Sequence, residues 1–336
     1  MASIIVLSST DDDAHHVKLD NKPELNVKPQ QAPIPTERPP LISELSVFPK
    51  ILGKGGFGTV RCCTSKRTKQ MLAIKTIQLK GSRQAKREQL EACRREASIH
   101  ALCSGDPNVV QFVAKFEGLF SNVHMIMELC QGGDLRTFLN SYSCGSRTPV
   151  HLAAVVMRQV LSALRHIHSL GIAHRDIKAS NILVSSPDNV ITESSFKLAD
   201  FGLAARFQCN RTEAPIPCRG RVGTPGYQAP ELLRGEPYYA PVDIWSAGIM
   251  LAKMLTGHYP RFLPWKKNKT QDEDSEWEVD EVLDFTSEPW SKLNHCVRNL
   301  LTGMLQFDPE KRPKAVHLLD FCWIRNSGCC KHSWSC

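Results

Sequence analysis

The stretch HRDIKASN at residues 174–181, followed by DFG at residues 200–202, decides the fold of this chain. The first stretch places a carboxylate (Asp176), a lysine (Lys178) and an amide (Asn181) within one turn-rich loop. The second adds another carboxylate, Asp200, beside a hinge glycine. Carboxylate and amide oxygens are suitable ligands for Mg²⁺, and a lysine can neutralise a phosphate. These residue types, in this order, predict a site for phosphoryl transfer.

A glycine-rich stretch, GKGGFGTV at residues 53–60, lies upstream between two predicted strands. Glycines let the backbone approach phosphates closely. The same pattern occurs in dinucleotide folds, but a helix follows the glycines there, whereas a strand is predicted here. Ala73-Ile74-Lys75 then places a lysine on the next strand but one, within reach of phosphates under the loop. Glu96, on the following predicted helix, is the available partner for its ammonium.

The pattern of apolar residues divides the chain into two parts. Short β-rich segments are predicted at 47–53, 58–64, 71–79, 109–117 and 123–129, with one helix at 84–103. After residue 130 the pattern becomes mostly helical, with buried helices at 150–170 and 242–256. The chain is therefore predicted to be α+β, with a strand-rich lobe (47–129) and a helical lobe (131–325). Residues 1–46 are predicted to be a disordered, proline-containing leader, 266–281 a solvated loop and 326–336 a short cysteine-rich tail.

Composition excludes several other classes of protein. The 336 residues carry a net charge of +8 and thirteen scattered cysteines, with no export signal and no apolar run long enough to span a membrane. An intracellular protein with mostly free thiols, in the cytoplasm and/or nucleus, is expected. Cys209 and Cys218 are interpreted as free thiols rather than zinc ligands. The basic stretch 80–95 is interpreted as a solvated helix face, so nucleic acid is not an expected partner.

The motifs together resemble the eukaryotic protein-kinase family of serine/threonine type, whose set is a glycine-rich loop, VAIK, HRD…N, DFG and APE. This chain reads LAIK at 72–75, HRDIKASN, DFG, and GTPGYQAPE at 223–231, and the resemblance covers roughly residues 47–325. It is most similar to the calcium/calmodulin-dependent group, with a weaker similarity to replication-initiating cell-cycle kinases. The resemblance implies the two-lobed protein kinase fold, with a small strand-rich N-lobe and a larger helical C-lobe. It also implies ATP and Mg²⁺ (or Mn²⁺) as cofactors, and protein substrates with serine or threonine hydroxyls.

Roles for individual residues follow from the same resemblance. Asp176 would orient the substrate hydroxyl and Lys178 would steady the γ-phosphate. Lys75, held by Glu96, would bind the α- and β-phosphates, while Asn181 and Asp200 would hold the metal. The residues expected to bind the nucleotide are Leu52, Gly53, Lys54, Gly55, Gly56, Phe57, Gly58, Thr59, Val60, Ala73, Lys75, Met127, Glu128, Cys130, Asp134 and Leu183.

Other matching positions are expected to be structural. Asp243 should brace the catalytic loop, and Arg312 should pair with Glu231. His100 is interpreted as a histidine tolerated in the core rather than a pH switch. Serine/threonine specificity rests on Lys178 and on the docking loop that contains Thr224.

The activation segment, residues 200–231, is where the sequence departs most from the family pattern, and the departure concerns how activity is regulated. Arg175 beside a catalytic acid usually pairs with a phosphate on the activation segment. Yet residues 213–222 contain no serine, threonine or tyrosine, and only Thr212 is nearby. Two hypotheses stay open: that Thr212 is the regulatory site, or, as we favour, that activity does not depend on phosphorylation of this segment.

Three function classes are compatible with parts of the sequence. An active kinase accounts for all the motifs. A pseudokinase scaffold would bind ATP without turnover, although every phosphate and metal ligand is present. A small-molecule phosphotransferase would lack GTPGYQAPE and the Glu231–Arg312 pair. The sequence identifies neither the substrate nor a regulatory partner.

Overall fold

The computed structural model describes residues 38–55, 58–118, 121–142, 147–187, 191–192, 194–207, 214–266 and 279–328. Its N-terminal half is an antiparallel sheet in the order β1-β2-β3-β5-β4, built from β1 (Leu45–Gly55), β2 (Gly58–Ser65), β3 (Met71–Gln78), β4 (Phe112–Glu117) and β5 (Asn122–Glu128). One long helix, α1 (Arg83–Cys103), begins after Ser82, whose hydroxyl accepts from the Ala85 amide as an N-cap. The predicted strands and helix of this lobe are confirmed.

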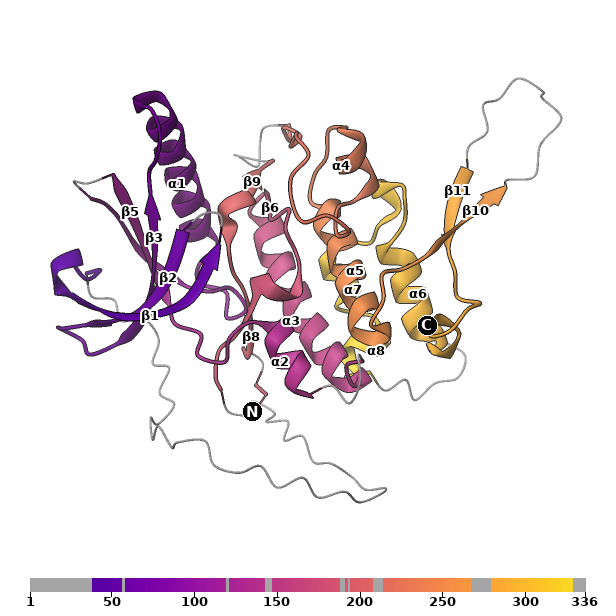
Figure 1. Cartoon of the computed structure of the whole chain (residues 1–336). Coiled ribbons are helices and arrows are strands. Elements are labelled where there is room, and N and C mark those ends of the chain that lie inside the picture. Colours follow the sequence, from indigo (N-terminus) through magenta and orange to yellow (C-terminus); the bar gives the residue numbers. More distant parts are fainter. Residues whose placement is uncertain are drawn as a thin grey trace, which may run out of the picture.

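The C-terminal half is mostly helical and lies beside the sheet (Figure 1). Its long helices are α2 (Leu135–Tyr142), α3 (Val150–Ser169), α5 (Pro241–Thr256) and α6 (His295–Met304). Shorter helices are α4 (Pro230–Arg234), α7 (Ala315–Leu318) and α8 (Cys322–Arg325). The apolar spacing that predicted α3 and α5 reflects burial, because nearly all of their aliphatic side chains belong to one core. This arrangement is the predicted α+β, two-lobed one.

Four short strands between the helices flank the loops that contain the HRD and DFG motifs. β6 (Ile172–Ala173) pairs with β9 (Ala205–Arg206), and β7 (Ile182–Val184) pairs with β8 (Phe196–Leu198). The HRD loop lies between β6 and β7, and the DFG turn lies between β8 and β9. The two small ladders therefore join segments that are about 33 and about 14 residues apart in the chain, which residue patterning at this strand length does not predict.

The predicted loop at 266–281 differs from the structure at its ends. β10 (Phe262–Lys266) and β11 (Val279–Leu283) form an antiparallel pair on the side of the C-lobe away from the N-lobe (Figure 1). The charged residues between them, 267–278, lie outside the described residues. The strands were not expected because their flanking sequence is rich in charge, which disfavours strands in isolation.

At the N-terminal end, the described chain begins at Arg38, within the predicted leader. The Arg38 guanidinium donates to Glu44 at 2.7 Å, and Lys66 of the β2–β3 turn donates to the Ser43 carbonyl at 3.0 Å. These contacts attach residues 38–44 to the sheet before β1 begins. At the other end, the described residues stop at Gly328, so most of the predicted tail lies outside them.

Among the described residues, no helix combines the length and the apolar character needed to cross a membrane. Seven of the described cysteines are free thiols, and Cys218 is one of them. Cys209, the other cysteine of the free-thiol prediction, lies outside the described residues.

Candidate active site

Lys75 on β3 is held between two carboxylates. Its Nζ lies 2.6 Å from Oε1 of Glu96 on α1 and 3.2 Å from Oδ1 of Asp200. Burial opposes the charge of this ammonium, but the two carboxylates outweigh burial and raise the pKa of Lys75. The lysine is therefore a fixed cation that joins the sheet, the long helix of the N-lobe and the DFG turn.

Asp200 is held in an uncommon backbone conformation. Its φ of 63° is left-handed, which few residues other than glycine adopt. Its side chain is 41% exposed, so the carboxylate is accessible although it contacts Lys75. Burial opposes ionisation, but the charge of Lys75 outweighs it and lowers the pKa of Asp200. At Gly202, an added Cβ would lie 3.3 Å from Oδ1 of Asp200, so the glycine keeps this carboxylate uncrowded.

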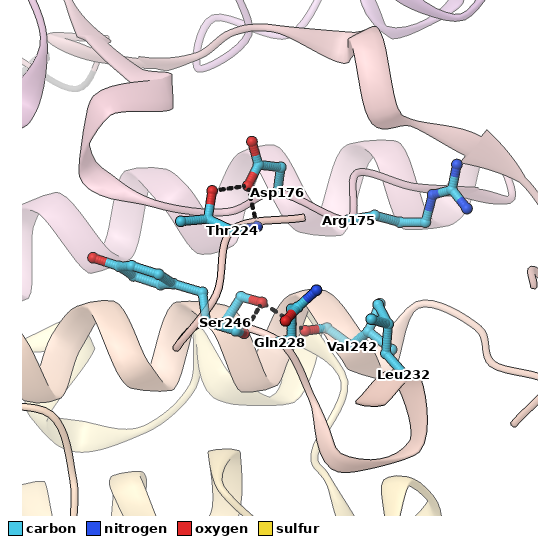
Figure 2. Close-up of a pocket in the computed structure, with 8 residues that line it drawn as sticks. Arg175, Asp176, Thr224, Gln228, Leu232, Val242 and Ser246 are labelled. Carbon is cyan, nitrogen blue, oxygen red and sulfur yellow. Dashed lines mark hydrogen bonds between the residues drawn. The ribbon is translucent and has the colours of Figure 1, made fainter. Parts of the chain in front are cut away.

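Asp176 lies at the centre of a hydrogen-bond network, of which Figure 2 shows the bonds to Thr224. Its Oδ1 accepts from the Thr224 amide at 3.0 Å and from the Thr224 hydroxyl at 2.7 Å. Its Oδ2 accepts from Lys178 at 2.8 Å and from the Asn181 amide at 3.0 Å. Lys178 also donates to the Thr224 hydroxyl at 2.6 Å. Burial raises the pKa of Asp176, but these donors outweigh burial and hold it below its usual range.

The loop that carries Asp176 is braced from beneath by α5. Asp243 is fully buried, and its carboxylate accepts from the backbone amides of His174 at 2.8 Å and Arg175 at 2.7 Å. His168 of α3 donates to the same carboxylate at 2.9 Å. These bonds stabilise Arg175 at a φ of 70°, which turns the chain so that the next residue faces the site. The predicted bracing role of Asp243 is confirmed.

A column of aromatic rings links the lobes behind these charges. Phe201 of the DFG turn is stacked on His100 of α1, with centroids 4.7 Å apart, and meets His174 edge-on at 5.1 Å. His100 donates from Nε2 to the Val110 carbonyl at 2.7 Å. Burial lowers the pKa of His100 to about 4, so the ring is neutral near pH 7. His100 is therefore a core histidine, as expected.

The residues predicted to bind a nucleotide lie on β1, β2, β3 and β5, on the segment after β5 and on β7. The β1–β2 register pairs Gly53 with Val60, and the next strands pair Ala73 with Met127. Gly58 has a φ of 140°, and an added Cβ there would lie 2.5 Å from the Thr76 carbonyl oxygen, so only glycine fits. The predicted positions are Leu52, Gly53, Lys54 and Gly55 on β1, Gly58, Thr59 and Val60 on β2, Ala73 on β3, Met127 and Glu128 on β5, Cys130 and Asp134 after β5, and Leu183 on β7. Gly56 and Phe57 lie outside the described residues.

The segment after β5 joins the two lobes. Asp134 pairs with Leu183 in an isolated bridge, which brings the predicted ribose acid beside the predicted adenine contact. Asp134 also caps α2, since its carboxylate accepts from the Thr137 amide at 2.7 Å. Burial raises the pKa of the Cys130 thiol to about 12, so this cysteine remains protonated.

One ionic contact at this junction was not predicted from the sequence. Lys197 on β8, itself buried, lies 2.6 Å from Oε1 of Glu128. The Gln111 amide donates to the other oxygen of Glu128 at 3.1 Å. The pair therefore ties the strand before Asp200 to the end of β5. The one sequence signal was a lysine within the otherwise apolar run of residues 196–199, and its partner is distant in the chain.

Glu231 and Arg312 form the second predicted pair. The guanidinium binds both carboxylate oxygens, at 2.6 and 2.7 Å, and both side chains are buried. Arg312 also donates to the carbonyls of Gln306, Pro241 and Phe307. The pair attaches the end of the docking segment to the C-terminal part of the helical lobe, which confirms its structural role.

The whole arrangement has the parts that phosphoryl transfer requires: a fixed cation, a carboxylate facing a docking loop, and accessible oxygen donors. A site of this kind would act by positioning its reactants and stabilising charge rather than by forming a covalent intermediate.

Comparisons with known proteins agree with this description. Residues 47–324 match the family model described as protein kinase domain. Calcium-dependent protein kinase 14 of Oryza sativa subsp. japonica is 36% identical over 279 residues, which is 83% of this chain and 50% of that protein. Calcium-dependent protein kinase 10 of Arabidopsis thaliana is 35% identical over 295 residues, 88% of this chain and 50% of that protein. The chain thus spans about half the length of these curated relatives. It belongs to the protein kinase family.

Proposed function

We propose that this chain transfers the γ-phosphate of ATP to serine or threonine hydroxyls of protein substrates. The observation that carries the proposal is the Asp176 network, in which one carboxylate is bound by the docking loop, Lys178 and Asn181. A carboxylate with a lowered pKa stays ionised at neutral pH and can accept or orient a hydroxyl proton. A scaffold without turnover would have no need to keep this whole network together with the Lys75–Glu96 pair.

Serine/threonine specificity is supported by the position of the docking loop. The Thr224 hydroxyl lies 2.7 Å from Oδ1 of Asp176 and 2.6 Å from Lys178. A substrate that binds on this loop therefore passes close to the carboxylate. A hydroxyl on a short side chain fits this approach, whereas tyrosine would need a more distant docking surface.

ATP would bind between the sheet and the C-lobe. Among the described residues, the backbone amide and carbonyl of Cys130 make no hydrogen bond, so both are open to a purine edge. Ala73, Val60 and Leu183 would supply apolar contacts to the ring. Lys75 would bind the phosphates, exchanging part of its contact with Asp200 for phosphate oxygens while Glu96 keeps it in place.

A divalent ion fits the donor set beside the phosphates. Asp200 has an ionised, accessible carboxylate, and the amide oxygen of Asn181 is available because its nitrogen already donates to Asp176. Mg²⁺ favours such oxygens and keeps several other positions for water or phosphate. When bound, the ion would neutralise phosphate charge, while Lys178 would steady the transferred group.

The test is incorporation of phosphate from Mg-ATP into a degenerate peptide library. Wild type should label serine or threonine peptides, and Asp176→Asn should lower the rate at least about a hundredfold. The variant should still bind ATP and retain the unfolding midpoint of the wild type. ATP binding without incorporation by the wild type would favour the pseudokinase reading, and labelling confined to tyrosine would overturn the specificity.

Control of this activity is proposed to be independent of phosphorylation in the activation segment. Arg175 is already bound, by the Leu203 carbonyl at 2.6 Å and the Tyr238 hydroxyl at 3.0 Å. Cys218 and Tyr238 exchange backbone hydrogen bonds at 2.8 and 3.1 Å, which attaches the segment to the C-lobe. These contacts hold the activation segment in place, as a phosphate on the segment paired with Arg175 would. Thr212, the alternative regulatory site, lies outside the described residues.

A further inference from the structure

The docking loop, defined here as residues 223–228, is surrounded by unmatched positive charge. The described segment 214–256 carries this loop together with α4 and α5. It contains four cationic residues and three acidic ones. Which of these charges are paired decides what kind of peptide the surface can accept.

All three acidic residues of the segment are already engaged. Glu231 is bound by Arg312, and Asp243 is fully buried under the catalytic loop. Glu236 is paired with Arg234 at 2.6 Å. Of the four cations, Arg234 alone has a carboxylate partner among the described residues, so the cations Arg219, Arg221 and Lys253 are left without one.

Lys253 lies directly beside the docking loop. Its Nζ is 3.6 Å from the centroid of the Tyr259 ring and 5.5 Å from that of Tyr227, which belongs to the loop. The two rings meet edge-on at 6.0 Å and hold the cation by the attraction of their faces. Tyr259 also packs so close to Gly226 that an added Cβ there would lie 2.9 Å from its ring. The cation is therefore positioned, rather than extended at random into solvent.

Two further cations lie near the same loop. Arg221 is exposed and lies two residues before Gly223, where the loop begins; its guanidinium lies against Gly235, where an added Cβ would be 3.6 Å from Nε. Arg136 on α2 is exposed, and its charge acts on the Tyr227 phenol. Neither has a carboxylate partner in the described part of the chain. Cations thus approach the loop from α2, from α5 and from the segment before it.

The shallow pocket between the loop and α5 is polar where it meets Asp176. Asp176, Thr224, Gln228 and Ser246 line it, with Leu232 and Val242 at its apolar end (Figure 2). Gln228 donates to the Val222 carbonyl at 3.0 Å, and Ser246 donates to the Tyr227 carbonyl at 2.7 Å. The loop is therefore fixed by Gln228 of its own and by Ser246 of α5, and the surrounding cations remain available to a ligand.

We propose that Lys253, Arg221 and Arg136 select protein substrates with aspartate or glutamate on either side of the acceptor hydroxyl. This proposal rests on the proposed kinase function and specifies the substrate class of the same site. Fixed cations around a docking loop attract acidic chains and repel basic ones, which gives specificity more than affinity. A peptide rich in arginine would place its charge against three cations that no nearby carboxylate neutralises.

The test compares peptides with one serine and with aspartate, alanine or arginine at each flanking position. Wild type should use the best aspartate peptide about fivefold better than its alanine counterpart, and arginine should be the worst choice, measured as kcat/KM. Lys253→Glu and Arg221→Glu should each abolish the aspartate preference at different flanking positions. The preference of the wild type should shrink as salt is raised, because exposed charges are screened.

Two controls separate charge from folding. Lys253→Gln removes the cation without adding repulsion, so it should lose the aspartate preference at the same flanking positions as Lys253→Glu while retaining the unfolding midpoint of the wild type. Lys50→Glu reverses an exposed lysine on β1, away from the docking loop, and should leave the preference intact. A preference for arginine, or an equal loss of preference in Lys50→Glu, would overturn the proposal.

A binding measurement keeps this proposal distinct from the kinase function. Fluorescently labelled aspartate and arginine peptides are titrated with the wild type and with Lys253→Glu, in the absence of ATP. Tighter binding of the aspartate peptide, lost in the variant, supports the docking surface even if no peptide were phosphorylated. Equal binding of both peptides overturns it, whereas absence of phosphate transfer to every peptide overturns the kinase proposal alone.

Discussion

Two ion pairs of the same length hold the two lobes, and they differ in their surroundings. Lys75–Glu96 in the N-lobe and Arg312–Glu231 in the C-lobe each have a nitrogen–oxygen distance of 2.6 Å. The C-lobe pair is bidentate, at most 2% exposed, and its guanidinium also binds three carbonyls. The N-lobe pair is also buried, at 10% and 8% exposed, but its ammonium is shared with Asp200, which is 41% exposed. A buried ion pair whose hydrogen bonds are all made within the protein can only stabilise the fold. A cation shared between two carboxylates can exchange one of them for a ligand.

The largest effect is expected from breaking the fully buried pair. Arg312→Met should lower the free energy of unfolding by about 3–5 kcal/mol, because Glu231 would be left buried without a cation. Urea denaturation measures the loss. Combining it with Glu231→Gln should recover part of the stability, since the buried charge is then gone. Arg234→Met, which removes an exposed pair, is the control and should change little; equal losses in both arginine variants would contradict the comparison.

Breaking the shared pair should affect activity more than stability. Lys75→Met should lower kcat by about 10²–10³-fold, because the positioned cation that would bind the α- and β-phosphates is lost. The fold should suffer less than in Arg312→Met, because burial already raises the pKa of Glu96, which can take up a proton when its cation is lost, and because Asp200 is 41% exposed and remains hydrated. Initial rates with Mg-ATP and the unfolding midpoint are measured together. Lys115→Met, on the edge strand β4 of the same sheet, is the matched control; a larger stability loss for Lys75→Met than for Arg312→Met would reverse the assignment of roles.

His100, a buried histidine of the aromatic column, should make the free energy of unfolding depend on pH. The pKa of His100 is about 4 in the folded protein and about 6.5 in the unfolded chain. The unfolded state therefore binds more protons between these values, so stability should fall as pH drops from 6.5 to 4, by on the order of 3 kcal/mol. His100→Leu should flatten this part of the profile in urea unfolding at several pH values. His151→Gln, at an exposed position, should not; an unchanged slope in His100→Leu would show that other groups cause it.

The smallest effect is expected where the activation segment meets Arg175. Tyr238→Phe removes one hydroxyl that bonds Arg175 at 3.0 Å and the Gly220 carbonyl at 3.0 Å. The loss of these hydrogen bonds should destabilise the ordered activation segment by about 1 kcal/mol. This should be measured as a severalfold lower kcat/KM. The measurement is made in a Thr212→Ala background, so that a phosphate there cannot compensate. Tyr239→Phe is the control, and loss of all activity in Thr212→Ala itself would refute phosphorylation-independent control.

Much of the N-lobe was predictable because its signals are local. Strands 47–53, 58–64 and 71–79 and the helix at 84–103 were recognised from alternation and periodicity, and each lies within a few residues of its observed bounds. The β10–β11 pair was not, because its strands are flanked by charge and stabilise each other only after they meet. Sequence alone also did not reveal Lys197–Glu128, since no local pattern shows which buried carboxylate a lysine in β8 will reach.

By itself the amino-acid sequence determined the residue types of the site and their order: a glycine-rich turn, one lysine, two carboxylates and an amide. These follow from chemistry that needs particular side chains at short spacings. Only the tertiary structure decided which charged groups share a partner, which are fully paired and which have no oppositely charged partner among the described residues. Asp176 is bound by a loop 48 residues away, and Lys253 lies beside the same loop with no carboxylate partner in the described part of the chain. Such outcomes depend on burial and on partners distant in the chain, which folding alone brings together.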